Sequence, residues 1–219
     1  VERKQRILIA VPTVDKAATG LPCLENLIMP GNAETKIFNV YGRPVADAYN
    51  CAAQQAIEDN ADWMITFEDD TFPQTDAIIR LFQLAKDNPS CAIGAWYPMR
   101  DKTLRGTHIY LKNNTREYLE SDEKIHEVYT LAMGCSIYPV EMFIKIPRPW
   151  FATTTMMTQD SFFSQQAREH GYKLLVDTSI KCTHRDRDTS DIYSVNGVIP
   201  SALQIPEELD ELLEKYVSG

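Results

Sequence analysis

The sequence has no apolar run of the roughly 20 residues that a membrane-spanning helix needs, which argues against a membrane span. It also has no CxxC pair, since its 5 cysteines are widely spaced, and this argues against a zinc knuckle. We expect the cysteines to be reduced core residues of a cytoplasmic protein. Basic residues are in the minority, and the resulting net charge of −9 argues against nucleic acid as the main partner. The chain also lacks a signal-peptide pattern, an internal repeat and a low-complexity segment.

What the chain does have is enough apolar material for a real core. Its 219 residues are 44% hydrophobic, which fits one large domain. We therefore expect a single domain over residues 1–219. In residues 1–100 apolar segments and amphipathic segments alternate, residues 101–190 are more irregular, and residues 191–219 form a tail with an acidic helix over 206–217.

The first half predicts alternating strands and helices. Short apolar runs rich in β-branched and aromatic residues predict buried strands at residues 7–11, 36–40, 63–67 and 92–97. We expect Pro12 to end the first strand. An amphipathic helix is predicted from Pro44 to about Glu58, and a second one after Pro73 with Ile78, Ile79, Leu81, Phe82 and Ala85 facing inward. Such alternation is typical of βαβ units, a mainly parallel sheet and a ligand site at the carboxyl ends of the strands.

The second half predicts shorter elements. A hairpin is expected from residues 109–111 and 116–119, and an extended segment from 129–138. A helix is predicted over 160–170, closed by Gly171 in a left-handed C-cap. The remaining apolar runs predict two short strands, at residues 173–176 and 180–182.

Three consecutive carboxylates follow the strand predicted at residues 63–67. Glu68, Asp69 and Asp70 should repel one another and raise each other's pKa unless a cation lies among them. A hard divalent ion such as Mn2+ or Mg2+ prefers the oxygen ligands that these side chains offer. The alternative is a solvated acidic turn that caps the helix that follows.

The order of several motifs resembles a known family. The segments ADWMITFEDDTFPQTDAI, MGCSIYPVEMF, PRPWF and TQDSFFSQQAREHGYKLLVDTSIKCTH follow one another as they do in the GT-A glycosyltransferases, particularly the inverting, nucleotide-sugar-dependent family 2. The resemblance extends over residues 7–184. It implies a GT-A (Rossmann-like) α/β fold, with a mixed, mainly parallel sheet flanked by helices. Residues 1–100 would then be the nucleotide-donor half and residues 101–190 the acceptor half.

The resemblance also implies an activity, a metal-dependent transfer of a hexose-type sugar. The donor would be a nucleoside-diphosphate sugar, the acceptor an unidentified hydroxyl group, and the transfer would invert the anomeric centre. If the proposed base lay far from the acceptor, a retaining course would remain open.

A DxD-type metal site is part of the same resemblance. It makes Asp70 the direct ligand of Mn2+ (or Mg2+), with Glu68 in the place of the usual first Asp. Glu68 or Asp69 would face the ribose or reach the metal through water. His184 falls where the family has a late histidine that completes the site, and an imidazole ligand favours manganese. The alternative for His184 is a histidine at a strand end that bonds only to backbone.

Asp160 corresponds to the catalytic base of the family, which takes the proton of the acceptor hydroxyl. Its position at a helix N-terminus suits a carboxylate. The alternative is that Asp160 is the N-cap of that helix. Gln159 stands where the family usually has a Glu that helps to bind the acceptor.

The resemblance also implies further residues that bind the donor and residues that bind the acceptor. Donor-binding residues would be Pro12, Thr13, Asp15, Arg43, Arg100 and Gly134, besides Glu68 and Asp69. Either arginine could replace the one that the family has before Asn50, and Gly134 would let the backbone approach the donor. Trp150 and Phe151 would form an acceptor platform, with plain core packing as the alternative.

Two other functions stay open at this stage. A nucleotidyltransferase would also hold phosphates and a metal with carboxylates, but it predicts a glycine-rich, lysine-containing loop that residues 11–16 lack. A non-catalytic nucleotide- or sugar-binding module is the other alternative, which Gln159 and the missing arginine favour.

Overall fold

The structure is a computed structural model that describes residues 3–13, 24, 26–101, 103–112 and 115–201. The predicted tail helix and Asp15 lie outside these residues. The strands are β1 (Gln5–Thr13), β2 (Ala33–Tyr41), β3 (Trp63–Phe67), β4 (Thr71–Pro73), β5 (Cys91–Trp96), β6 (Ile109–Lys112), β7 (Thr115–Tyr118), β8 (Ile125–Glu127), β9 (Cys135–Pro139), β10 (Lys173–Arg185), β11 (Ile192–Ser194) and β12 (Gly197–Ile199). The helices are α2 (Val45–Glu58), α3 (Ala77–Asp87), α4 (Val140–Lys145) and α5 (Gln159–Glu169).

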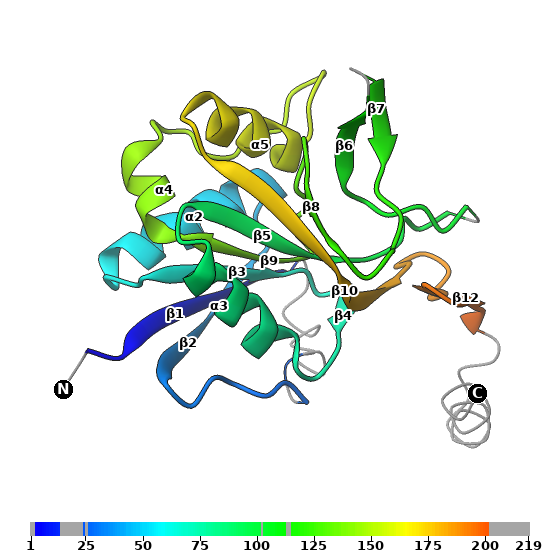
Figure 1. Cartoon of the computed structure of the whole chain (residues 1–219), viewed down its shortest axis with the longest axis horizontal. Coiled ribbons are helices and arrows are strands. Elements are labelled where there is room, and N and C mark those ends of the chain that lie inside the picture. Colours follow the sequence, from blue (N-terminus) through cyan, green and yellow to red (C-terminus); the bar gives the residue numbers. More distant parts are fainter. Residues whose placement is uncertain (1–2, 14–23, 25, 102, 113–114, 202–219) are drawn as a thin grey trace.

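One twisted sheet dominates the molecule (Figure 1). Its strand order is β12-β11-β10-β5-β9-β3-β1-β2, with β4 and β8 paired to β10. From β2 to β10 all strands run in one direction except β9, which is antiparallel to both β3 and β5. The predicted fold class, a mixed and mainly parallel α/β sheet, is therefore confirmed.

Helices cover both faces of this sheet because the central strands are apolar on both faces. In β1, Leu8 and Ala10 pack into a core with α2, α4 and α5. The alternate residues of β1 pack into a second core with α3 on the opposite face; they are Ile7, Ile9 and Val11. Among the described residues, no helix combines the length and the apolar character that a membrane crossing would require.

The first half matches its predictions closely. Each predicted strand is present, and the two predicted helices are α2 and α3. Pro12 does not end its strand, because β1 continues to Thr13 in register with β2. Ile79 does not face inward: it is 37% exposed, while the neighbouring Ile78 is fully buried. The short strand β4 was not predicted.

The second half of the chain differs more from the elements predicted for it. The hairpin β6–β7 and the helix α5 are confirmed, and Gly171 has the left-handed backbone expected of it, with φ of 81°. The two predicted strands at 173–176 and 180–182 are one strand, β10, which bulges between Asp177 and Lys181. Only the last part of the extended segment 129–138 is a strand, β9.

Two strand pairings bring the ends of distant segments together. β4 pairs with β10 so that Thr71 lies opposite His184, and the N–H of Arg185 donates to the carbonyl of Asp70 at 2.7 Å. The end of β10 therefore lies directly beside the acid triplet that follows β3.

Four of the cysteines lie in the described residues, and all four are free thiols. Cys91, Cys135 and Cys182 are buried and Cys51 is half-buried, as expected of reduced core residues.

Candidate active site

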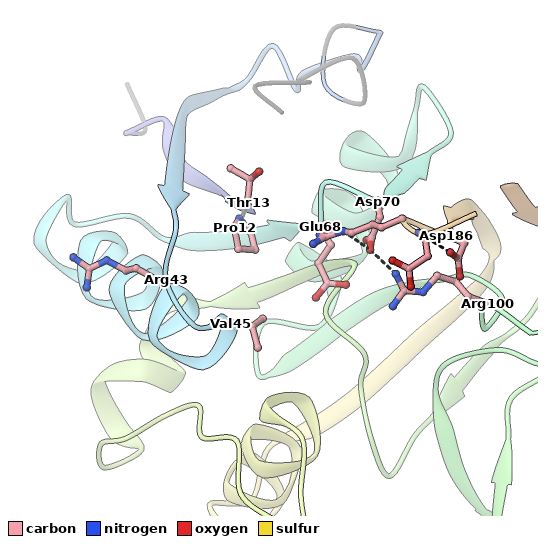
Figure 2. A pocket seen from close by; sticks show the side chains of 10 residues that line it. Pro12, Thr13, Arg43, Val45, Glu68, Asp70, Arg100 and Asp186 are labelled. Atoms are coloured by element: carbon pink, nitrogen blue, oxygen red, sulfur yellow. Dashed lines mark hydrogen bonds and ion pairs between the residues drawn. The ribbon is translucent and has the colours of Figure 1, made fainter. Parts of the chain in front are cut away.

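A cavity of about 530 Å³ opens at the carboxyl ends of β1 and β3 (Figure 2). We call it the donor cavity. Its lining is mostly charged and consists of Pro12, Thr13, Arg43, Val45, Glu68, Asp70, Arg100, Asp186, Arg187 and Asp188. The predicted residues Pro12, Thr13, Arg43, Glu68, Asp70 and Arg100 are thus brought to one place.

Asp70 is the most buried carboxylate of this cavity, with a relative exposure of 6%. Its Oδ2 accepts a hydrogen bond from Arg100 at 2.9 Å and lies 3.3 Å from Nε of Arg187. Its Oδ1 is buried and has no hydrogen-bond partner among the described residues. That oxygen lies 3.8 Å from Nε2 of His184. The arginines therefore hold one carboxylate oxygen and leave the other facing the histidine.

The hydrogen bonding of His184 fixes which nitrogen can bind a metal. Nδ1 lies 2.9 Å from the carbonyl oxygen of Pro98, and because a carbonyl only accepts, Nδ1 must carry the proton. Burial lowers the pKa of His184 and so favours the neutral ring. Nε2 then presents a lone pair toward Asp70.

A divalent ion fits these two atoms. An orphaned buried carboxylate oxygen and an imidazole lone pair are suitable ligands for Mn2+, and a bound diphosphate would supply further oxygens. Within the described residues, however, no three histidine, cysteine or acidic side chains form a complete metal-binding group. Of the predicted set of Asp70, His184 and Glu68, the structure brings Asp70 and His184 together, and the complete set stays a prediction.

Glu68 is held away from that pair by a tyrosine. The hydroxyl of Tyr49 in α2 donates to Oε1 of Glu68 at 2.8 Å. Burial, with the charge of Asp70 as the next cause, raises the pKa of Glu68 to about 7. The second of these causes is the repulsion expected between neighbouring acids, and the site is one where added positive charge would be stabilising. Asp69, the third acid, forms an ion pair with Arg187.

A second cavity of about 460 Å³ adjoins the first, and we call it the acceptor cavity. Glu68 and Arg100 line both cavities. The other lining residues are mainly uncharged: Tyr97, Met99, Asp101, Thr107, Ala132, Met133, Thr158, Gln159, Asp160 and His184. The predicted base Asp160 and the metal-site residue His184 therefore lie on one cavity.

Asp160 comes from the first turn of α5. The N-cap of that helix is Thr158, so the alternative reading of Asp160 as the N-cap is wrong. The N–H of Ser161 donates to Oδ1 of Asp160 at 2.8 Å, and the hydroxyl of Thr158 also donates to it. These bonds hold the Asp160 carboxylate in a fixed orientation at the start of the helix.

Trp150 and Phe151 do not lie on the acceptor cavity. They are 2% and 1% exposed, and Phe151 stacks on Phe163 with ring centroids 4.9 Å apart. Asn50 fixes this segment, since its Oδ1 accepts from the N–H groups of both residues. The acceptor platform is therefore corrected to core packing, because neither ring offers a free face.

Protein packing by itself requires a glycine at position 134. A Cβ at this position would lie 2.6 Å from Oγ1 of Thr71 and 2.7 Å from the hydroxyl of Tyr97. The glycine N–H donates to that hydroxyl at 2.8 Å. Gly134 lines neither cavity, whereas the neighbouring Ala132 and Met133 line the acceptor cavity.

No functional role was predicted for the loop after β10. Asp186, Arg187 and Asp188 line the donor cavity, and Arg187 pairs with both Asp69 and Asp70. The available signal was the dense alternation of charges immediately after His184. Figure 2 places Arg43 on the opposite side of the cavity from Asp70, with its guanidinium directed away from the carboxylates.

Solved structures share this architecture. The structure of A197 from STIV matches with a TM-score of 0.65 and 19% identity, over 90% of this chain and 93% of that chain. A structure of GalNAc-T7 with UDP, GalNAc and Mn2+ matches with a TM-score of 0.53 and 10% identity, over 82% of this chain and 43% of that chain. At these identities the likeness establishes the fold. The search of curated proteins found no match.

A family model provides the stronger link. The model described as glycosyl transferase family 2 matches residues 35–146, which is half of the chain. The matched range contains the acid triplet, Arg100 and Gly134, while Asp160 and His184 lie beyond it. With the GT-A-like fold and an acid-lined cavity at the strand ends, this match shows that the chain belongs to glycosyl transferase family 2.

Proposed function

We propose that this protein is a metal-dependent, inverting glycosyltransferase that moves a hexose-type sugar from a nucleoside-diphosphate sugar to an acceptor hydroxyl. The observation that carries the proposal is the pair formed by Oδ1 of Asp70 and Nε2 of His184, 3.8 Å apart at the border of the two cavities. The family supplies the nucleotide-sugar donor. The GalNAc-T7 structure, which holds Mn2+ in a similar fold, supports the choice of metal.

The donor cavity suits a diphosphate. Asp70 and His184 would hold Mn2+, which when bound neutralises the charge of the departing diphosphate. Arg100 and Arg187 add fixed positive charge beside the same carboxylate. The nucleoside would lie toward Pro12, Thr13 and Arg43, at the end of β1.

The acceptor cavity, which is lined mainly by uncharged residues, suits a neutral hydroxyl compound, and Asp160 is the proposed proton acceptor. Asp160 would accept the hydroxyl proton while the acceptor oxygen forms a bond to the anomeric carbon. The bond between that carbon and the phosphate oxygen breaks at the same time, and the nucleoside diphosphate leaves. Attack from the acceptor cavity on a sugar held from the donor cavity would be in line, and the anomeric centre would be inverted.

Calorimetric titration with a panel of nucleoside diphosphates, with and without Mn2+, tests the donor site. We expect binding that needs Mn2+ and that is lost in Asp70→Ala, while Asp101→Ala, on the acceptor side only, binds normally. Release of nucleoside diphosphate from the matching donor sugar should then identify the substrate. Metal-independent binding with no turnover over hours would favour a non-catalytic binding module instead.

The stereochemical course is tested separately. NMR of the product should show an inverted anomeric configuration. A retained configuration would remove Asp160 from the role of base, without affecting the assignment of the donor cavity.

A further inference from the structure

The strand β2 is an unusual edge of the sheet. It has nine residues, includes neither proline nor glycine, and among the described residues it pairs only with β1 (Figure 1). Most of its first half is exposed, including Ile37 at 43%. A long, regular strand of this kind presents unpaired backbone groups that can pair with another strand.

The sequence of β2 is self-complementary about Thr35. In an antiparallel pair of two copies centred on this residue, Glu34 of one copy lies opposite Lys36 of the second copy, and the same contact occurs twice. On the other face of the strand, Ala33 lies opposite Ile37 of the second copy. Acid therefore meets base and apolar meets apolar at every position next to the axis.

Contacts within the chain extend this complementarity. The register with β1 puts Glu34 beside Arg6, with Nε and Oε2 3.4 Å apart, and Lys36 forms an ion pair with Asp59 at 2.6 Å. Across the axis the charges of four side chains would alternate between positive and negative. Their order is Arg6 and Glu34 of one copy, then Lys36 and Asp59 of the second copy. The side chains of Glu34 and Lys36 are 61% and 56% exposed, so both are available.

We propose that two copies of this chain associate through their β2 strands, antiparallel and with Thr35 on the two-fold axis, so that the sheet continues from one copy into the other. The occupant of this edge is a second copy because the residues that flank Thr35 complement themselves. The active site lies at the ends of the strands and plays no part in the contact, so this proposal is independent of the proposed function.

Disulfide cross-linking tests the register directly. In Thr35→Cys the two cysteines of a dimer face each other, with Cα atoms about 4.5–5.5 Å apart, which a disulfide can bridge. In the matched control Ile37→Cys the two Cα atoms are roughly 13 Å apart along the strands, which is too far. Under mild oxidation of the full chain, we expect a covalent dimer from Thr35→Cys, and neither from Ile37→Cys nor from the unaltered protein.

Charge reversal tests the proposed complementarity. By sedimentation velocity over a range of concentrations, Glu34→Lys and Lys36→Glu should each weaken dimerisation by about tenfold or more, because each places like charges opposite one another twice. The two variants mixed together should associate, since each then supplies the charge that the other lacks. Melting temperatures within a few degrees of the unaltered protein confirm that the variants fold.

Three results would overturn the proposal. One is a monomer at every concentration together with no cross-link from Thr35→Cys, which would mean that the charges on β2 protect the edge. A second is a dimer that cross-links equally well through position 37. The third is a dimer that neither charge reversal weakens.

Discussion

The donor cavity and the acceptor cavity share Glu68 and Arg100 but differ in almost everything else. Charged side chains from four segments line the donor cavity, and its most buried acid, Asp70, pairs with both Arg100 and Arg187. Apart from the two shared residues, most of the residues that line the acceptor cavity are methionine, threonine, glutamine and alanine. Asp160 is the carboxylate of this cavity that lies in the first turn of a helix. The difference teaches that charged side chains are concentrated where a diphosphate would bind, whereas the cavity proposed for the acceptor is lined mainly by uncharged side chains.

The largest effect should come from removing that carboxylate. Asp160→Asn should lower the turnover rate by about 10²–10⁴-fold, because the amide cannot accept the acceptor's proton. Donor affinity should stay unchanged, since Asp160 does not line the donor cavity. Steady-state release of nucleoside diphosphate and calorimetry measure the two quantities.

Asp101→Asn is the matched control for that experiment, because Asp101 lines the same cavity and its carboxylate is tied to Thr103 and Arg105. Its turnover should change only a few-fold. Equal losses in the two variants would mean that the cavity needs negative charge in general and not a base at position 160.

The aromatic cluster behind the acceptor cavity should matter for stability and not for acceptor binding. Phe151→Ala removes a ring that stacks on Phe163 and contacts Tyr49 and Phe143, and it should cost about 3–5 kcal/mol of unfolding free energy. Urea denaturation measures this. The exposed Ile144 serves as control, since Ile144→Ala should be nearly neutral. A stable Phe151→Ala protein with weakened acceptor binding would restore the platform interpretation.

A buried histidine also makes stability depend on pH. His108 is fully buried: its Nε2 donates to the carbonyl of Ala95 at 2.7 Å, and its Nδ1 accepts from the N–H of Ala132 at 3.1 Å. Burial lowers the pKa of His108 from 6.5 to about 4. Between pH 6.5 and 4, His108 therefore binds a proton in the unfolded chain but not in the folded chain. This difference should remove up to about 3 kcal/mol of stability as pH falls from 6.5 to 4.

Urea denaturation at a series of pH values measures this dependence. In His108→Gln this part of the slope should disappear, whereas His170→Gln, at an exposed site, should keep the slope of the unaltered protein. An unchanged slope in His108→Gln would assign the acid sensitivity to other groups.

The smallest effect is expected at Gly134, which packs against Thr71 and Tyr97. Gly134→Ala should cost about 1–3 kcal/mol, because its Cβ would displace Tyr97 or Thr71, which are both buried. Gly31→Ala is the control, since its Cβ would meet nothing within 4 Å and it should change stability by about 0.5 kcal/mol or less. Thermal denaturation of the two variants compares them, and equal melting temperatures would contradict the tight packing at Gly134.

The sequence alone determined most elements of the first half, though not β4, and the position of the acid triplet. Strands such as β3 are short, apolar and bounded by polar residues, so local pattern is enough to locate them. The family's motif order placed Asp70, Asp160 and His184 among the candidate residues. It did so without any information about how far apart they lie.

Only the tertiary structure decided which of these residues meet. The pairing of β4 with β10 brings His184 to Asp70, and no local pattern specifies a contact between strands so far apart in the chain. Burial likewise decided that Trp150 and Phe151 belong to the core, because an aromatic pair after a proline fits a surface platform and a core equally well. Neighbouring residues in the sequence determine the local structure and the type of side chain at each position. Which distant side chains come into contact depends on long-range packing.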